Sequence, residues 1–130
     1  MASAAQKLIL RIAMPLCGAA LAVGLGLAAL GASAGELVST QYRLDAGKLV
    51  EGPQVLRVKQ GDALTLTWHS VQAAEIHLHG YDILIKVPAG GSAEMKVRAN
   101  ATGRFPITLH GLEGGGHRHR PLAYLEVHPQ

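Results

Sequence analysis

The fold is decided by the stretch Val58-Lys59-Gln60-Gly61-Asp62-Ala63-Leu64-Thr65-Leu66-Thr67-Trp68. A Gly-Asp pair, which is typical of a turn, is followed by apolar and polar residues that alternate from Leu64 to Trp68. Successive side chains of a β-strand point to opposite faces, so this alternation is typical of a strand with one buried face. The stretch therefore predicts a turn that leads into a half-buried strand.

The same pattern extends in both directions along the chain. Short apolar runs are separated by Gly, Pro, Asn and Asp, and no window after Gly35 sustains the apolar period of a helix. We expect strands near Leu37–Leu44, Gln54–Val58, Ala63–His69, Glu75–His79, Ile83–Val87, Ala93–Arg98, Arg104–His110 and Leu122–Val127. Many short strands without crossover helices favour an all-β fold, a Greek-key β-sandwich or barrel of about seven to eight strands with antiparallel pairing. The large rings available to fill its core are Trp68, Tyr81, Phe105 and Tyr124.

The N-terminal segment has the order of a secretory signal peptide. Lys7 and Arg11 precede an apolar run from Ile12 to Leu30, which is followed by Ala32-Ser33-Ala34. This order of charge, apolar stretch and small residues describes a secretory signal peptide, and the small residues occupy the positions that signal peptidase recognises. We therefore expect residues 1–34 to be a helical signal peptide, cleaved after Ala34, and residues 35–130 to be the folded domain. The alternative is a retained membrane anchor, because the run is nearly long enough to span a bilayer.

Cleavage would place the protein in the periplasm or outside the cell, with no membrane attachment. It would also remove Cys17, the one cysteine, so that no disulfide, thiolate nucleophile or thiolate ligand remains. Loss of Lys7 and Arg11 reduces the 12 basic residues to 10 against 9 acidic ones, a net charge of +1. No basic tract with interleaved aromatic residues is present, so we expect no nucleic-acid partner.

All seven histidines lie in the expected mature chain. His77 and His79 are two residues apart in a strand pattern, so their rings share one face. His110 closes a later strand just before the glycine-rich segment 111–116, and His117 and His119 follow that segment. Histidines at strand ends and on an adjoining loop can converge at one end of a sandwich, and neutral imidazole suits copper, zinc and nickel. The candidate metal ligands are His77, His79, His110, His117 and His119. We expect copper, as Cu²⁺, with zinc as the alternative.

Each candidate also has a simpler interpretation. Solvent-facing alternation would give the same spacing of His77 and His79, and His110 could be a buried structural imidazole. The run His117-Arg118-His119-Arg120 could be a solvated loop or a basic patch that binds an anion, and its arginines would repel a dication. Met95 lies in an alternating strand pattern and is expected in the core rather than as a thioether ligand. Glu75 shares the face of His77, where it could orient an imidazole or be a surface charge.

Several segments resemble the cupredoxin family. Val58–Trp68 resembles its strand-turn-strand segment, and Thr102–His110 is similar to the strand that ends at the copper loop. The other similar segments are His79-Gly80-Tyr81-Asp82-Ile83, with the first copper-binding histidine; His77-Leu78-His79-Gly80, like the His-x-His-Gly motif of multicopper oxidases; Pro88–Ala93, a turn; and Ala123–Val127, the closing strand. The resemblance covers nearly all of residues 35–130. It implies a cupredoxin-like fold with copper at His79, His110 and either His117 or His119.

The departures from this family limit what the resemblance implies. Leu109 occupies the position of the copper-binding cysteine, and no methionine follows Met95 to serve as axial ligand. A blue copper site depends on copper–thiolate bonding. The resemblance therefore implies a histidine-ligated, non-blue site, and electron transfer does not carry over.

These observations lead to two hypotheses about function. The first is an exported copper-binding protein that acts as a metal carrier, buffer or delivery module, whose partner is a periplasmic or membrane-bound metal-handling protein. The second is a metal-free interaction module that binds an acidic partner or an anion through the loop His117–Arg120. We do not expect an enzyme, because the sequence offers no Ser/His/Asp constellation at a diagnostic spacing.

Overall fold

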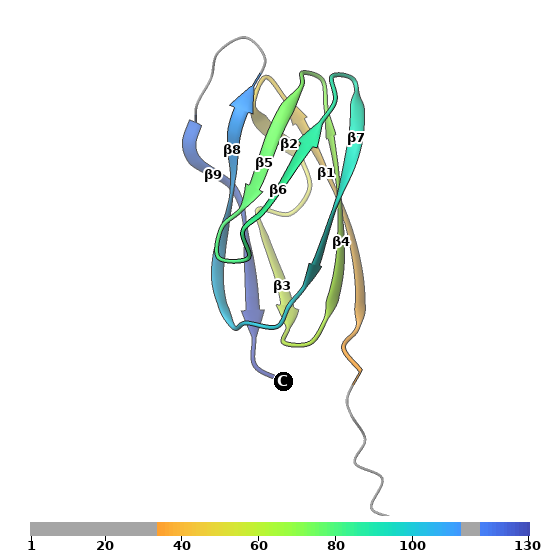
Figure 1. Ribbon diagram of the computed structural model, residues 1–130, viewed down its shortest axis with the longest axis vertical. Helices are drawn as coiled ribbons and strands as arrows, with labels where there is room; N and C mark the ends of the chain where they lie inside the picture. The colour runs from red at the N-terminus through yellow and green to blue at the C-terminus, as the bar shows by residue number, and fades with distance from the viewer. Residues whose placement is uncertain (1–33, 113–117) are drawn as a thin grey trace, which may run out of the picture. The chain divides into compact units, whose positions relative to one another are not determined.

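A computed structural model of the chain describes residues 34–112 and 118–130 (Figure 1). They form nine strands: β1 Leu37–Asp45, β2 Lys48–Glu51, β3 Val55–Lys59, β4 Ala63–Ser70, β5 Ala74–Leu78, β6 Ile83–Val87, β7 Gly91–Arg98, β8 Gly103–Leu112 and β9 Arg118–His128. The expected all-β fold is confirmed. The strand beyond the expected seven to eight is β2, which the sequence pattern did not reveal because it is only four residues long.

The strands form two sheets that pack face to face. One sheet has the order β2-β1-β4-β7, and the other has the order β3-β9-β8-β5-β6. Figure 1 shows the chain crossing repeatedly between them, so β5 and β8 are neighbours although β6 and β7 separate them in sequence. This crossover is the one expected of a Greek-key sandwich.

Two of the strand pairs are parallel, which corrects the expectation of antiparallel pairing throughout. In the first sheet β1 runs parallel to β4, with Leu37 opposite Ala63. In the second, β3 runs parallel to β9, with Val55 opposite Tyr124. Parallel neighbours need a long connection. The chain supplies it by passing through the opposite sheet before it returns.

The core lies between the two sheets and is filled by the inward residues of each alternating strand. Leu64, Leu66 and Trp68 are buried on β4, as their period-two pattern predicts. Met95 is fully buried, so its prediction as a core residue is confirmed.

The aromatic rings of the core differ from the expected set. Tyr42 stacks on Trp68 with ring centroids 4.2 Å apart and planes 9° from parallel. Tyr81, Phe105 and Tyr124 are only half-buried. Tyr42 lies on the inner face of β1, opposite Trp68 in the pairing of β1 with β4. Only that pairing makes Tyr42 a core residue.

The predicted turn at Gly61-Asp62 is held by the side chain of Asp62, which is buried. Its Oδ2 accepts a hydrogen bond from the backbone N–H of Lys59 at 2.8 Å, and its Oδ1 accepts one from that of Glu36 at 2.8 Å. Gly61 has a φ of 95°, which glycine adopts without strain. The turn thus joins the start of β1 to the β3–β4 connection.

The expected signal peptide, residues 1–34, lies outside the described residues except for Ala34. Its helix, its cleavage and the boundary of the folded domain at residue 35 therefore stay predictions. In the part of the chain that the structure describes, no helix is long and apolar enough to cross a membrane.

Candidate metal centre

Strand β5 presents His77 on the outer face of the five-stranded sheet. Ala74, Ile76 and Leu78 are buried in the core, so the side chain of His77 points away from it. His79 is the first residue after β5, where a strand was expected to continue. Its backbone N–H still donates to the carbonyl of Pro106 on β8 at 3.0 Å. The two imidazoles lie side by side with centroids 4.2 Å apart, so the predicted sharing of one face is confirmed.

His110 reaches the same face because of a β-bulge. In the pairing of β5 with β8, Ile76 lies opposite Leu109 and Glu75 lies opposite Gly111. His110 is thus the extra residue of β8, with no opposite residue on β5. Its ring centroid is 4.8 Å from that of His77 and 5.8 Å from that of His79. His110 is 31 residues from His79 and 33 from His77 in the chain, and the three side chains meet here.

The three imidazoles form a group whose nitrogens can converge on one ion. His77 Nδ1 lies 3.2 Å from His110 Nε2, and one ligand atom from each of His77, His79 and His110 lies within 4.8 Å of the other two. Two nitrogens bound about 2.0–2.1 Å from a zinc ion at tetrahedral angles stand about 3.3 Å apart. His77 and His110 already match this spacing. The ligand atoms of the group stand up to 4.8 Å apart, about 1.5 Å more than this spacing, and rotation of the side chains would close that difference and complete a three-nitrogen site.

Two of these histidines have hydrogen-bond partners on their Nε2 atoms. His77 Nε2 lies 3.1 Å from Asp82 Oδ1, and His79 Nε2 lies 2.8 Å from Thr108 Oγ1. An ionised carboxylate only accepts hydrogen bonds, so Nε2 of His77 carries the proton and Nδ1 keeps its lone pair. Metal-binding histidines almost always donate their other N–H in this way. The donor set and its hydrogen bonds therefore fit a metal ion.

Asp82 and Thr108 were not among the residues that the sequence predicted for the site. Asp82 ends the turn between β5 and β6 and has a φ of 54°, which aspartate tolerates better than most residues. Thr108 lies opposite His77 in the pairing of β5 with β8. A pairing prediction for these two strands would have revealed Thr108, whereas no pattern in the sequence indicates the contact of Asp82.

The electrostatic surroundings keep His79 neutral. Partial burial lowers its pKa below the ordinary value of 6.5, and the neighbouring imidazoles of His77 and His110 lower it further. The carboxylate of Asp82 acts in the opposite direction but more weakly. A neutral imidazole is the form that binds metals, so His79 is ready to bind near pH 7.

The other predicted ligands do not contribute to the described group. His117 lies outside the described residues, and of His119 only the backbone, in β9, is described. Their part in a metal site stays a prediction. The group that is described lies on a sheet face, not at one end of the sandwich as expected, because β8 extends past His110 to Leu112. Leu109, at the position of a cupredoxin cysteine, is buried in the core.

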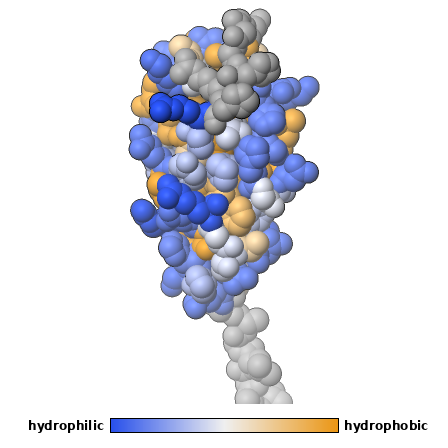
Figure 2. Space-filling model, turned by 90° about the vertical axis from the view of Figure 1, so that its left-hand side faces the viewer, coloured by the Kyte–Doolittle hydropathy of each residue, from blue (hydrophilic) through white to orange (hydrophobic). Residues whose placement is uncertain are grey.

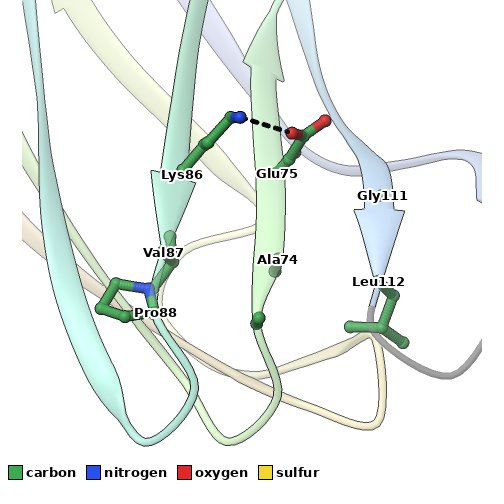
Figure 3. Close-up of a pocket in the computed structure, with 8 residues that line it drawn as sticks. Ala74, Glu75, Lys86, Val87, Pro88, Gly111 and Leu112 are labelled. Carbon is green, nitrogen blue, oxygen red and sulfur yellow. Dashed lines mark ion pairs between the residues drawn. The ribbon is translucent and has the colours of Figure 1, made fainter.

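Among the described residues, the ionic partner of Glu75 is a lysine. Its Oε1 lies 3.5 Å from Nζ of Lys86 on β6 (Figure 3). The two side chains border a largely apolar groove of about 460 Å³, at the ends of β5, β6 and β8, which Val87, Pro88 and Leu112 also line. This ion pair is in line with the expectation of a surface charge, and the second role considered for Glu75, that of orienting an imidazole, stays a prediction.

The rest of this face is mostly polar. Figure 2 shows the side on which β8 and β9 lie, where hydrophilic side chains cover most of the surface with apolar ones between them. Glu126 pairs with Arg57 at 3.1 Å and with Arg104 at 3.6 Å, and the Arg104 guanidinium lies 4.0 Å from the centre of the Tyr124 ring. Two of the basic side chains on this face thus have an acidic partner.

Comparison with known proteins identifies similar folds but no family. No protein-family model and no curated protein sequence matches the chain. One similar chain belongs to the cryo-EM structure of a heme-copper terminal oxidase dimer, with a TM-score of 0.60 and 16% identity, covering 75% of this chain and 68% of that one. Another is the NMR solution structure of a copper binding protein in the apo form, with a TM-score of 0.50 and 12% identity, covering 69% of this chain and 88% of that one. Identities this low show the fold alone, which is the β-sandwich that the cupredoxin resemblance implied.

Proposed function

We propose that this protein is exported and binds one copper(II) ion through His77, His79 and His110, as a carrier, buffer or delivery module. The observation that carries the proposal is the convergence of three imidazoles from two strands within 4.8 Å. The hydrogen bond that His77 Nε2 donates to Asp82 and the hydrogen bond between His79 Nε2 and Thr108 support it, because each engages one ring nitrogen and leaves the other to the ion.

Copper is favoured over other ions by the chemistry of the donors. An all-nitrogen site suits copper(II), zinc and nickel, and copper(II) binds most tightly of the divalent first-row ions to a given site. The similar structures come from a copper binding protein and a heme-copper oxidase, which supports the same choice. Zinc is the competitor, since it accepts three histidines and one further ligand.

The exposure of the site supports exchange of the ion with a partner protein, which a transport role requires. His110 is exposed, whereas His77 and His79 are half-buried. An ion held there keeps a side toward solvent, where a ligand from another protein can replace a water molecule. We propose a periplasmic or membrane-bound metal-handling protein as the partner that delivers or accepts the ion.

Export is the part of the proposal that rests on residues 1–34. The test is the mass of the protein recovered from the periplasmic or secreted fraction of a bacterial host. Cleavage after Ala34 gives a chain that begins at Gly35 and lacks Cys17. A protein that keeps its N-terminal segment and sediments with membranes would instead establish the retained anchor.

The metal site is tested on protein purified without a polyhistidine tag, which would bind the same ions. Elemental analysis should find copper, and titration of the stripped protein with copper(II) should saturate at about one equivalent with a nitrogen-rich paramagnetic spectrum. The variant His79→Ala/His110→Ala should lose at least about 100-fold in affinity, because removing two of three ligands leaves no chelate.

The matched control is His69→Ala/His128→Ala, which removes two histidines outside the group. It should bind copper as tightly as the unaltered protein. Unchanged affinity in the His79/His110 variant would eliminate the site.

The variant His117→Ala/His119→Ala tests whether the loop adds ligands. A copper-free protein that binds an acidic partner through this loop would favour the interaction module.

A further inference from the structure

The contact between Asp82 and His77 has more consequence than an ordinary surface ion pair. The side chain of Asp82 is 97% exposed and that of His77 is 15% exposed. An exposed pair of this kind contributes little to stability. Yet the carboxylate is aimed at the outward nitrogen of an imidazole whose other nitrogen faces His110. Its effect therefore falls on the metal site.

The turn that carries Asp82 is held to the neighbouring strand without any metal. The Tyr81 hydroxyl donates to the carbonyl of Ala101 at 2.8 Å and accepts from its N–H at 3.1 Å. The Tyr81 ring also packs edge-on against Phe105, with centroids 4.8 Å apart. These contacts fix Tyr81, the residue next to Asp82, so Asp82 meets His77 before an ion arrives.

The carboxylate acts on a bound ion in two ways. It holds the proton of His77 on Nε2, which leaves the Nδ1 lone pair directed at His110 and the ion. It also places a negative charge one imidazole away from the ion. The attraction between them is proportional to the charge of the ion, so a divalent cation gains twice as much as a monovalent one.

The imidazole nitrogens of the site also favour a divalent ion over copper(I). Copper(I) prefers soft sulfur ligands, whereas imidazole also suits divalent copper and zinc. Met95, the methionine within the described residues, is fully buried in the core and offers no thioether to the histidines.

We propose that Asp82 is a positioning residue that fixes the tautomer of His77 and makes the three-histidine site selective for divalent over monovalent ions. This inference rests on the proposed function, and it assigns the cargo as copper(II) or zinc(II) and not copper(I). Asp82 does not touch the ion. It acts through His77.

Two substitutions separate the charge from the hydrogen bond. Asp82→Asn removes the charge but keeps an oxygen that accepts the Nε2 proton, and Asn tolerates the φ of 54° at this position. Asp82→Gly removes both charge and acceptor and also tolerates that φ. Asp45→Asn, which alters an exposed aspartate at the end of β1, is the matched control.

The first measurement needs no metal: the ¹⁵N chemical shifts of His77 in the stripped protein report which nitrogen carries the proton. Asp82→Asn should keep the proton on Nε2, whereas Asp82→Gly should give a mixture of the two tautomers. The second measurement compares affinities for copper(II) and zinc(II) with that for copper(I) under anaerobic conditions. Asp82→Asn should lower divalent affinity about tenfold and copper(I) affinity about threefold, which is half the change in binding free energy, and Asp45→Asn should change neither.

An unchanged tautomer in Asp82→Gly, or an equal loss of copper(I) and divalent affinity in Asp82→Asn, would overturn the inference and leave the proposed function intact. A lack of binding of any of these ions by the unaltered protein would overturn both.

Discussion

Phe105 lies so close to the backbone of Gly80 that a Cβ at Gly80 would stand 2.4 Å from Cδ1 of the Phe105 ring. Gly80 also has a φ of 85°, which is strained for any residue with a side chain. Gly80 immediately follows His79 and belongs to the turn that carries Asp82. The φ of Gly80 and the ring of Phe105 on β8 thus both exclude a larger residue at position 80, in the turn that links His79 to Asp82.

Replacement of Gly80 by alanine should therefore damage stability and metal binding together. We expect Gly80→Ala to lower the free energy of unfolding by about 3 kcal/mol, from strain at positive φ and overpacking against Phe105. Copper(II) affinity should fall at least about tenfold, because His79 and Asp82 shift with the turn. Denaturant unfolding and copper titration measure the two effects.

Gly90 provides the matched control for this substitution. It has a φ of 66°, but a Cβ there would have no atom within 4 Å. Gly90→Ala should cost only about 1 kcal/mol and leave copper affinity unchanged. Equal destabilisation by the two substitutions would show that the contact with Phe105 is not what constrains the turn.

The hydroxyl of Tyr42 leads to a prediction about pH. Burial raises its pKa from 10.0 to about 12, and among the described residues it has no hydrogen-bond partner. An unfolded tyrosine loses its proton near pH 10, whereas the folded protein keeps it to about pH 12. Between these values the folded state holds more protons, so stability should fall as pH rises, by up to about 3 kcal/mol.

Tyr42→Phe isolates this effect. The substitution removes a buried polar atom without a partner, so the free energy of unfolding at pH 7 should rise by about 1 kcal/mol. The fall in stability between pH 10 and 12 should be smaller than in the unaltered protein. Tyr81→Phe, which loses two hydrogen bonds to Ala101, should instead be less stable at pH 7. Parallel pH profiles for Tyr42→Phe and the unaltered protein would contradict the assignment.

Asp62 should be among the most important polar residues for stability. Its buried carboxylate accepts from two backbone N–H groups, those of Lys59 and Glu36. Asp62→Ala leaves both donors unpaired and should lower the free energy of unfolding by about 3 kcal/mol. Asp45→Ala, at an exposed position, should change it by less than about 0.5 kcal/mol. Chemical denaturation followed by Trp68 fluorescence provides the comparison, and a small loss for Asp62→Ala would mean that water replaces the carboxylate.

Thr108 offers a test of the site that leaves every histidine in place. Thr108→Val keeps the shape of the side chain but removes the hydroxyl that lies 2.8 Å from His79 Nε2. The imidazole then loses its fixed orientation, and copper(II) affinity should fall about tenfold. Thr67→Val, on the outer face of the other sheet, should bind copper normally. A loss of affinity in both variants would point to a general effect of valine and not to His79.

Part of this structure follows from local patterns in the sequence. Alternation from Leu64 to Trp68 predicts a half-buried strand, and β4 has that burial pattern. A spacing of two residues places His77 and His79 on one face wherever the strand pairs. Such features depend on neighbours along the chain, and the sequence lists those neighbours directly.

The remaining features depend on which strands pair and in what register. A shift of one residue between β5 and β8 would turn His110 to the opposite face, and a bulge opposite Ile76 and Glu75 decides its position. The parallel pairs, the burial of Tyr42 and the contacts of Asp82 and Thr108 have the same origin. The sequence alone thus determined the strands, the expected export signal and the supply of imidazoles. Only the tertiary structure decided which imidazoles meet, because strand register is a balance of packing over the whole sandwich.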